Sequence, residues 1–335
     1  MQNNTLPNPS FFEQLRKITR NEIKSYDPSF EDPVEVILTE YFKINPYHLP
    51  LRSRFMKWFK QYEKTSPRCH EDLVYVPIYF FPTSKNYDKL FLNFVLTVTL
   101  IDIDDSSQGD KNFMTDFAIK CLKTLNPDPT LPTSILEFIK AMIGFLSGVD
   151  DYLKKYYLLI MVEFFEGCQT EHKVDRWSQS FDEYLENRRD VILLRMYTYA
   201  IWIIEDRFDR KEFDLVFDIM RDVDEWGVMM NDHLSVWKEI EEEDPGNWIL
   251  IKCKQTGETF NDVYTEQFKQ TLDKTYVLMN KLQMVDLANN TDIGKNILHF
   301  VAGIYIYGIS IVNDTKLGIV NVDQEQNLGR NVKIK

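Results

Sequence analysis

Long apolar segments with few interruptions are the feature that most restricts the fold of this chain. Lys154–Phe165 and Asp190–Arg207 each carry an apolar block too long for an ordinary strand, so both are predicted to be buried helices. Phe213–Trp226 repeats apolar residues at helical spacing, with acidic residues on the opposite face. Phe91–Asp105 is rich in β-branched residues, but its length favours a helix. We therefore expect an all-α fold.

Short breaker sequences, rather than linkers, separate these segments. The 335 residues include only 12 Gly and 13 Pro, and no stretch rich in Gly, Ser or Pro resembles a domain linker. Ser134 is predicted to cap the helix that follows it, with Glu137 completing a capping box. We expect one all-helical domain over residues 1–335, with residues 1–30 as a flexible N-terminal segment.

The chain is acidic, with a formal net charge of -13. This excess of carboxylates disfavours binding to nucleic acids and to anionic membrane surfaces, which both need Lys and Arg. The longest apolar run, Ile297–Val312, is too short to cross a bilayer. The N-terminus has neither the apolar stretch of a signal peptide nor the Arg/Ser bias of a transit peptide, so a cytoplasmic protein is expected. The sequence is compatible with a homodimer.

A first acidic cluster ends the predicted helix Phe91–Asp105. Asp102, Asp104 and Asp105 lie in its last turns, and Asp110 follows shortly after. Carboxylates at the C-terminal end of a helix oppose its macrodipole and repel one another, and a bound cation would relieve both effects. The alternative is a solvated helix end that runs into an acidic loop.

A second cluster places three oxygen-bearing side chains four residues apart. Asn231, Ser235 and Glu239 lie within a sector of about 80° on one helix face. An amide oxygen, a hydroxyl and a carboxylate form a hard ligand set suited to Mg²⁺, and without nitrogen or sulfur ligands the face does not suit zinc. The alternative is an ordinary polar helix face.

Together the two clusters resemble the metal-binding motifs of class I terpene synthases. The family's downstream motif, N-D-x-x-S-x-x-x-E, is matched in full by Asn231, Asp232, Ser235 and Glu239. The resemblance covers roughly residues 75–320 and implies a helical bundle around a central active-site cavity.

The upstream motif of the family, D-D-x-x-D, is matched only in part. Asp104 and Asp105 fit its leading pair, but Gln108 stands at the fifth position and the next acid is Asp110. Asp102 shares a helix face with Asp105 and is an alternative ligand. We favour Asp104 and Asp105 as metal ligands on this motif.

Two basic residues fall where the family binds diphosphate. Arg188, in a Y-L-x-x-R context, lies 43 residues before Asn231 and resembles the arginine with which terpene synthases sense the diphosphate. Its planar guanidinium suits bidentate contact with phosphate oxygens. The family's Arg-Tyr pair near the C-terminus is replaced by Thr315 and Lys316, and Lys316 is predicted to act as a point charge on the phosphate.

The resemblance also implies the reaction. A carbon–oxygen lyase of this family uses three Mg²⁺ ions, for which Mn²⁺ can substitute, to ionise a prenyl diphosphate and convert the carbocation to a terpene. A cytoplasmic farnesyl diphosphate pool favours a sesquiterpene. Aromatic faces stabilise cations, and Phe94 and Trp226 are predicted to contact the substrate because they lie near the two motifs.

Two rival functions stay open. A prenyl-chain-elongating transferase has the same fold, but it normally carries two D-D-x-x-D motifs and basic residues for a second diphosphate. A catalytically inactive homologue or an acidic helical interaction protein would also fit the irregular first motif.

Overall fold

The computed structural model describes residues 40–64, 71–106, 111–171 and 173–314, and within these ranges every regular element is a helix. The N-terminal half contains α3 (His48–Tyr62), the 3-10 helix η3 (Glu71–Tyr75), α4 (Val76–Phe80), α5 (Tyr87–Ser106), α6 (Lys111–Thr124), α7 (Thr133–Phe145) and α8 (Asp151–Glu171). The C-terminal half contains the 3-10 helix η4 (Arg176–Ser178), α9 (Phe181–Arg189), α10 (Leu194–Ile204), α11 (Arg210–Glu242), α12 (Trp248–Thr256), α13 (Phe260–Asn289) and α14 (Ile293–Asp314). The all-α prediction is confirmed.

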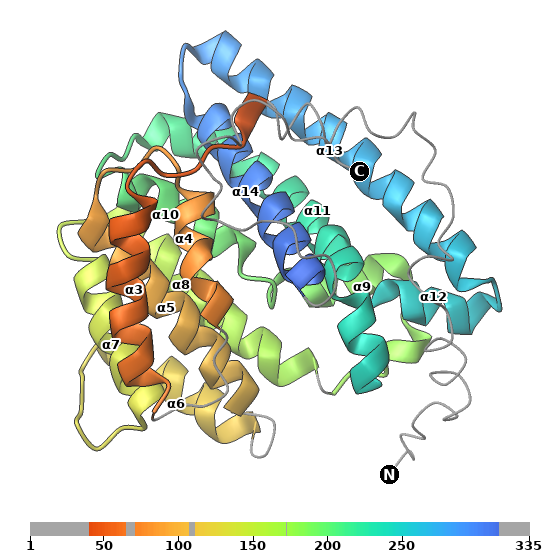
Figure 1. Cartoon of the computed structure of the whole chain (residues 1–335), viewed down its shortest axis with the longest axis horizontal. Helices are drawn as coiled ribbons and strands as arrows, with labels where there is room; N and C mark the ends of the chain where they lie inside the picture. The colour runs from red at the N-terminus through yellow and green to blue at the C-terminus, as the bar shows by residue number, and fades with distance from the viewer. Residues whose placement is uncertain (1–39, 65–70, 107–110, 172, 315–335) are drawn as a thin grey trace.

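The helices form a bundle around a shared apolar core. Its largest cluster of buried side chains draws on residues from Leu51 in α3 to Tyr305 in α14. Figure 1 shows α11 and α14 near the middle of the view, α13 along one side, and α3, α5 and α7 on the other. No helix in the described ranges is long and apolar enough to cross a membrane. The single domain over residues 1–335 stays a prediction, and residues 1–30 lie outside the described residues.

Two long helices bring the predicted metal motifs to the same end of the bundle. Figure 1 shows α5 and α11 both descending toward the lower part of the view, where α9 also lies. The aspartates stand in the last turn of α5, and Asn231–Glu239 occupies the C-terminal third of α11.

Capping explains where some of these helices begin. Ser180 and Glu183 form a capping box at the start of α9. The box predicted at Ser134 is wrong, because α7 begins two residues earlier than predicted, at Thr133, with Pro132 at the capping position and no side-chain cap. The proline side chain has no hydrogen-bond acceptor, so it cannot cap the first N–H groups of α7. Glu137 instead pairs with Lys140 at 2.8 Å.

The helix predicted over Asp190–Arg207 begins later than expected. Residues 190–193 separate α9 from α10, and Leu193 has a left-handed backbone with φ of 60°. Immediately after the break α10 packs closely on α11. The Cδ1 atom of Leu194 lies only 1.5 Å from where a β-carbon on Gly227 would stand. A larger residue at position 227 would force the Leu194 side chain to move, so glycine allows this close approach of α10 to α11.

Candidate metal and diphosphate site

Four of the predicted site residues come together between α9 and α11. The Ser235 hydroxyl donates to the backbone oxygen of Asn231 at 2.8 Å, and it also hydrogen-bonds the carboxylate of Glu239. Arg188, in the last turn of α9, donates from Nη2 to Oδ1 of Asn231 at 3.4 Å. The predicted diphosphate sensor is therefore adjacent to the predicted ligand face of α11.

The carboxyl group of Glu239 is held in an environment that disfavours its charge. Burial raises its pKa to about 8, and the neighbouring Asp232 adds to that rise. The positive charge of Arg188 and hydrogen bonds from Asn247 and Ser235 oppose the rise without cancelling it. A buried carboxyl of this kind gains from a nearby cation, because the cation stabilises the ionised form.

Asp232 lies about 20° from Glu239 around α11, and its carboxylate joins three helices. Its Oδ1 accepts from the Tyr184 hydroxyl of α9 at 2.7 Å, and its Oδ2 accepts from the backbone N–H of Trp248 at the start of α12 at 3.3 Å. Burial raises its pKa to about 7, and Arg188 and these hydrogen bonds limit the rise. Asp232 thus anchors α9 and α12 to α11.

Asn247 is a site residue whose role the sequence did not reveal. Its Nδ2 donates to Oε2 of Glu239 at 2.5 Å and to the backbone oxygen of Asp232 at 2.8 Å. Its Oδ1 accepts from the backbone N–H of Ile249 and caps α12. An Asn before an apolar run is a recognisable N-cap signal, but its contact with Glu239 depends on the turn between α11 and α12.

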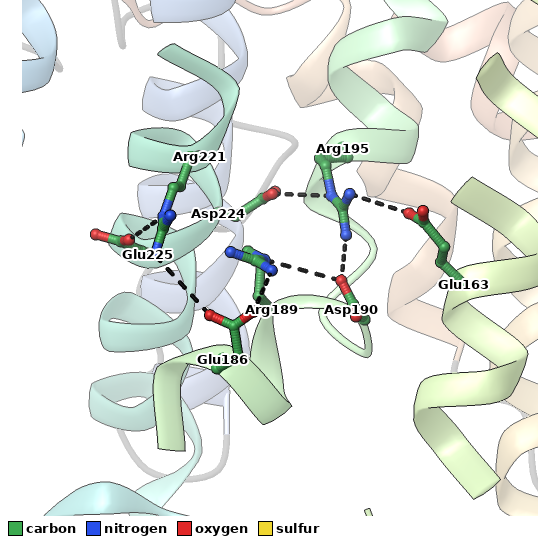
Figure 2. Close-up of polar contacts among 8 residues, drawn as sticks. All are labelled: Glu163, Glu186, Arg189, Asp190, Arg195, Arg221, Asp224 and Glu225. Carbon is green, nitrogen blue, oxygen red and sulfur yellow. Dashed lines mark hydrogen bonds and ion pairs between the residues drawn. The ribbon is translucent and has the colours of Figure 1, made fainter. Parts of the chain in front are cut away.

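A network of ion pairs fixes the break between α9 and α10 (Figure 2). Arg195 of α10 pairs with Glu163 of α8 at 3.1 Å, with Asp224 of α11 at 2.9 Å, and with Asp190 in the break. Burial works against the charge of Arg195, but the three carboxylates raise the pKa of its guanidinium. Asp224 is 1% exposed, and burial raises the pKa of its carboxyl well above the ordinary value. Arg195 therefore ties the end of α9 to both neighbouring helices.

The aspartate-rich end of α5 is described only in part. Asp104 is exposed in the last turn of the helix. Asp102 is buried and accepts a hydrogen bond of 2.6 Å from the Tyr62 hydroxyl of α3, and its role as the alternative metal ligand stays a prediction. The side chain of Asp105 and the whole of Asp110 lie outside the described residues, as does Lys316 at the C-terminus.

The two aromatic residues predicted to contact substrate pack as core residues. The ring of Phe94 stacks on Phe55 of α3 with centroids 4.6 Å apart. Phe94 lies about 80° from Asp104 around α5, and its ring is directed toward α3. Trp226 is fully buried, and its Nε1 donates to the Thr275 hydroxyl at 2.9 Å.

The donor set fits a hard divalent cation. No group of three or more His, Cys, Asp or Glu side chains converges among the described residues, so a zinc-type site is not formed by them. The amide, hydroxyl and carboxyl oxygens of Asn231, Ser235 and Glu239 instead resemble the few protein ligands that Mg²⁺ takes when phosphate and water complete its shell. Such an ion would stabilise the ionised form of Glu239, whose pKa burial beside Asp232 raises to about 8.

A family model decides which family this arrangement belongs to. Residues 112–270 match the model described as "Terpene synthase family 2, C-terminal metal binding". Residues 112–270 belong to the terpene synthase family. The match includes Arg188 and the whole Asn231–Glu239 face, and it begins after the aspartate-rich end of α5. The predicted resemblance to class I terpene synthases is confirmed.

Solved structures confirm the fold. An α-eudesmol synthase superposes with a TM-score of 0.64 at 16% identity, covering 80% of this chain and 96% of the other. Linalool/nerolidol synthase from Streptomyces clavuligerus, in complex with 2-fluorogeranyl diphosphate, superposes with a TM-score of 0.67 at 15% identity, covering 80% of this chain and 96% of the other. Germacradien-4-ol synthase from Streptomyces citricolor superposes with a TM-score of 0.63 at 14% identity, covering 81% of this chain and 94% of the other. No curated protein matches the chain.

Proposed function

We propose that this terpene synthase homologue is a Mg²⁺-dependent carbon–oxygen lyase that ionises a prenyl diphosphate, with farnesyl diphosphate favoured, and converts the carbocation to a sesquiterpene. The proposal rests mainly on one observation. Arg188 stands 3.4 Å from Asn231 at the head of the Asn231–Ser235–Glu239 face, within the stretch that matches a metal-binding family model. A linalool/nerolidol synthase of the same fold binds a fluorinated geranyl diphosphate, which supports this substrate class.

Each residue of the site has a distinct part in the proposal. Asn231, Ser235 and Glu239 hold metal from α11, and Asp104 and Asp105 hold metal from α5. Three Mg²⁺ ions, or Mn²⁺ in their place, would supply Lewis-acid stabilisation of the leaving diphosphate. Arg188 donates to the phosphate oxygens as the C–O bond breaks and charge collects on them. Lys316 is proposed to add a further positive charge.

Metal ions between the carboxylates and the diphosphate explain how an acidic protein holds an anionic substrate. Carboxylates concentrate cations at one end of the bundle, and the cations with Arg188 then attract the diphosphate. We place the enzyme in the cytoplasm.

Incubation with geranyl, farnesyl and geranylgeranyl diphosphate, with and without Mg²⁺, tests the proposal directly. We expect Mg²⁺-dependent release of diphosphate and a volatile product by gas chromatography with at least one substrate. A Glu239→Gln variant should lose about a hundredfold or more in turnover, because it removes the charge of a proposed ligand. Glu258→Gln, a matched change at an exposed glutamate, should behave as the unaltered protein.

Addition of isopentenyl diphosphate separates the rival functions. If product forms only in its presence and has a longer chain, the protein is an elongating transferase and the lyase proposal is wrong. If no prenyl diphosphate is turned over under any of these conditions, the protein is an inactive homologue.

A further inference from the structure

Four buried polar side chains lie in the core on and beside α5, two of them one turn apart on α5 and the others on α8 and α10. We call Asn93, Thr97, Tyr157 and Tyr197, from helices α5, α8 and α10, the polar core group. The Thr97 and Tyr197 hydroxyls lie 3.0 Å apart and share a hydrogen bond between α5 and α10. Burial raises the pKa of Tyr157, and Tyr197 adds to that rise, so the two phenols lie close enough to interact electrostatically.

The hydrogen-bonding capacity of this group is only partly used. Asn93 is fully buried, and within the described part of the chain neither its amide nitrogen nor its amide oxygen has a hydrogen-bond partner. The hydroxyl of the fully buried Tyr157 is likewise unpartnered there. Leaving such groups unpaired in a core is unfavourable, and an internal water with two to four polar partners is the usual way to satisfy them. The group therefore has the donors and acceptors that hold a water molecule.

The polar core group lies at a distance from the proposed metal site that a bound substrate could span, so a water held there could react with it. Asn93, Thr97 and Asp104 lie within about 40° of one another around α5, so they share one helix face. Along the axis, Thr97 and Asn93 are about 10 and 16 Å from Asp104. These distances are comparable with the length of a prenyl chain of two or three isoprene units. A chain whose diphosphate is held near Asp104 would reach the polar core group if it followed this face.

Two aromatic rings pack against Tyr197, one member of the hydroxyl pair. Phe80 of α4 meets the Tyr197 ring edge-on at 5.1 Å, and the Phe300 ring of α14 lies 6.0 Å from it. Rings of this kind stabilise a nearby cation and exclude bulk water. A single water fixed among them would be the nearest nucleophile for a carbocation in this region.

We propose that the polar core group binds one water molecule and delivers it to the carbocation, so that the main product is a terpene alcohol. This inference rests on the proposed function and names its product class. The water oxygen forms the new C–O bond with its lone pair. The resulting oxonium loses a proton, which ends on the diphosphate released in the first step. The net change is prenyl diphosphate plus water giving alcohol plus diphosphate, which balances in atoms and charge.

The experiment determines whether the oxygen atom of the alcohol product comes from water. The full chain is incubated with Mg²⁺ and each prenyl diphosphate in H₂¹⁸O, and the extract is analysed by gas chromatography and mass spectrometry. We expect an alcohol that carries ¹⁸O. A contaminating phosphatase cleaves the P–O bond and leaves the substrate's own oxygen, so its alcohol product is unlabelled.

Matched variants test the residues. Tyr197→Phe and Thr97→Val keep the shape of the core, and Asn93→Leu removes the unpartnered amide. Each should lower the ratio of labelled alcohol to hydrocarbon by about tenfold, on the scale of losing one well-placed hydrogen bond. Thr99→Val is the control, because Thr99 is a buried threonine of the same helix whose hydroxyl, within the described residues, donates to the α5 carbonyls of Val95 and Leu96. It should keep the ratio of the unaltered protein.

The two proposals fail in different ways. If diphosphate is released but the product is an unlabelled hydrocarbon, or if the three variants keep the ratio of the Thr99→Val control, the water site is wrong and the lyase function stands. If the unaltered protein releases no diphosphate from any substrate, the proposed function is wrong and this inference falls with it.

Discussion

Asn247 shows how one buried amide can serve both the fold and the proposed chemistry. Its oxygen caps α12, and its nitrogen bridges the backbone of Asp232 and the carboxylate of Glu239. Residues that hydrogen-bond a metal ligand fix its orientation, and their loss typically weakens metal binding by about 10- to 100-fold. We infer that Asn247 is a positioning residue for Glu239.

Replacing this residue should separate its two roles. Asn247→Asp keeps an oxygen suited to the N-cap but loses both N–H donors and places a second carboxylate beside Glu239. We expect the Mg²⁺ concentration for half-maximal turnover to change by about tenfold or more, with helical circular dichroism unaltered. Asn247→Ser, which also keeps a capping oxygen but adds no charge, should give a smaller change in the same readout. An unchanged Mg²⁺ dependence in Asn247→Asp would mean that Asn247 acts only as a cap.

At the scale of elements, the break between α9 and α10 depends on one buried arginine. Arg195→Met should leave Asp224 buried without its ion-pair partner, and removal of one partner from a buried pair costs about 3–5 kcal/mol. Urea denaturation at pH 7 measures this loss as a lower midpoint. Arg221→Met, a change at an exposed arginine of Figure 2, should leave the midpoint nearly unaltered.

A double variant provides the stricter check. Asp224→Leu in the Arg195→Met background removes the orphaned carboxylate, so it should recover most of the lost stability. If the Arg195→Met and Arg221→Met variants have the same urea midpoint, the ion pairs of Arg195 do not stabilise the segment between α9 and α10.

The contrast between α11 and α10 shows what the sequence could predict. Residues of α11 repeat at helical spacing, so the chain alone indicated both the helix and the common face of Asn231, Ser235 and Glu239. The start of α10 could not be predicted from periodicity, because residues 190–193 are apolar enough to continue a helix. Their conformation depends on contacts of Arg195 and of Leu194 with other helices.

The aromatic residues of the pocket are harder to predict for a related reason. Phe94 and Trp226 are predicted from their nearness to the motifs along the chain, whereas contact depends on the helix face, and their contact with substrate stays a prediction. Residues 93 and 97 lie closer to the direction of Asp104 around α5 than Phe94 does. Asn93 carried no sequence signal of its own, since a lone Asn in an apolar helix gives no indication of its partners.

At the scale of the whole molecule, the acidic character of the chain sets how substrate can bind. With 39 Lys and Arg against 52 Asp and Glu, the protein repels a free diphosphate at long range. Cations held by the proposed ligands would make the local electrostatic potential positive, so that it attracts the diphosphate. Affinity for the anion should therefore depend on the metal, and by linkage affinity for the metal should depend on the anion to the same degree.

Thermal unfolding tests this coupling without any turnover. A ligand present at a hundredfold excess over its Kd stabilises the folded state by about 2.7 kcal/mol, which for a chain of this size corresponds to a rise in Tm of roughly 4 °C. We expect Mg²⁺ and inorganic pyrophosphate together to give a shift of this order, and either one alone to give much less.

Chelation and substitution show whether the shift arises at the proposed site. EDTA should abolish the rise in Tm, and Glu239→Gln should reduce it while Glu258→Gln leaves it intact. If pyrophosphate alone produced the full rise, the anion would be held by basic side chains and not through metal. A full rise in Glu239→Gln would instead place the metal away from the α11 face. Because both results are read from the folded protein, they would hold even if the substrate of the enzyme were a prenyl diphosphate of another length.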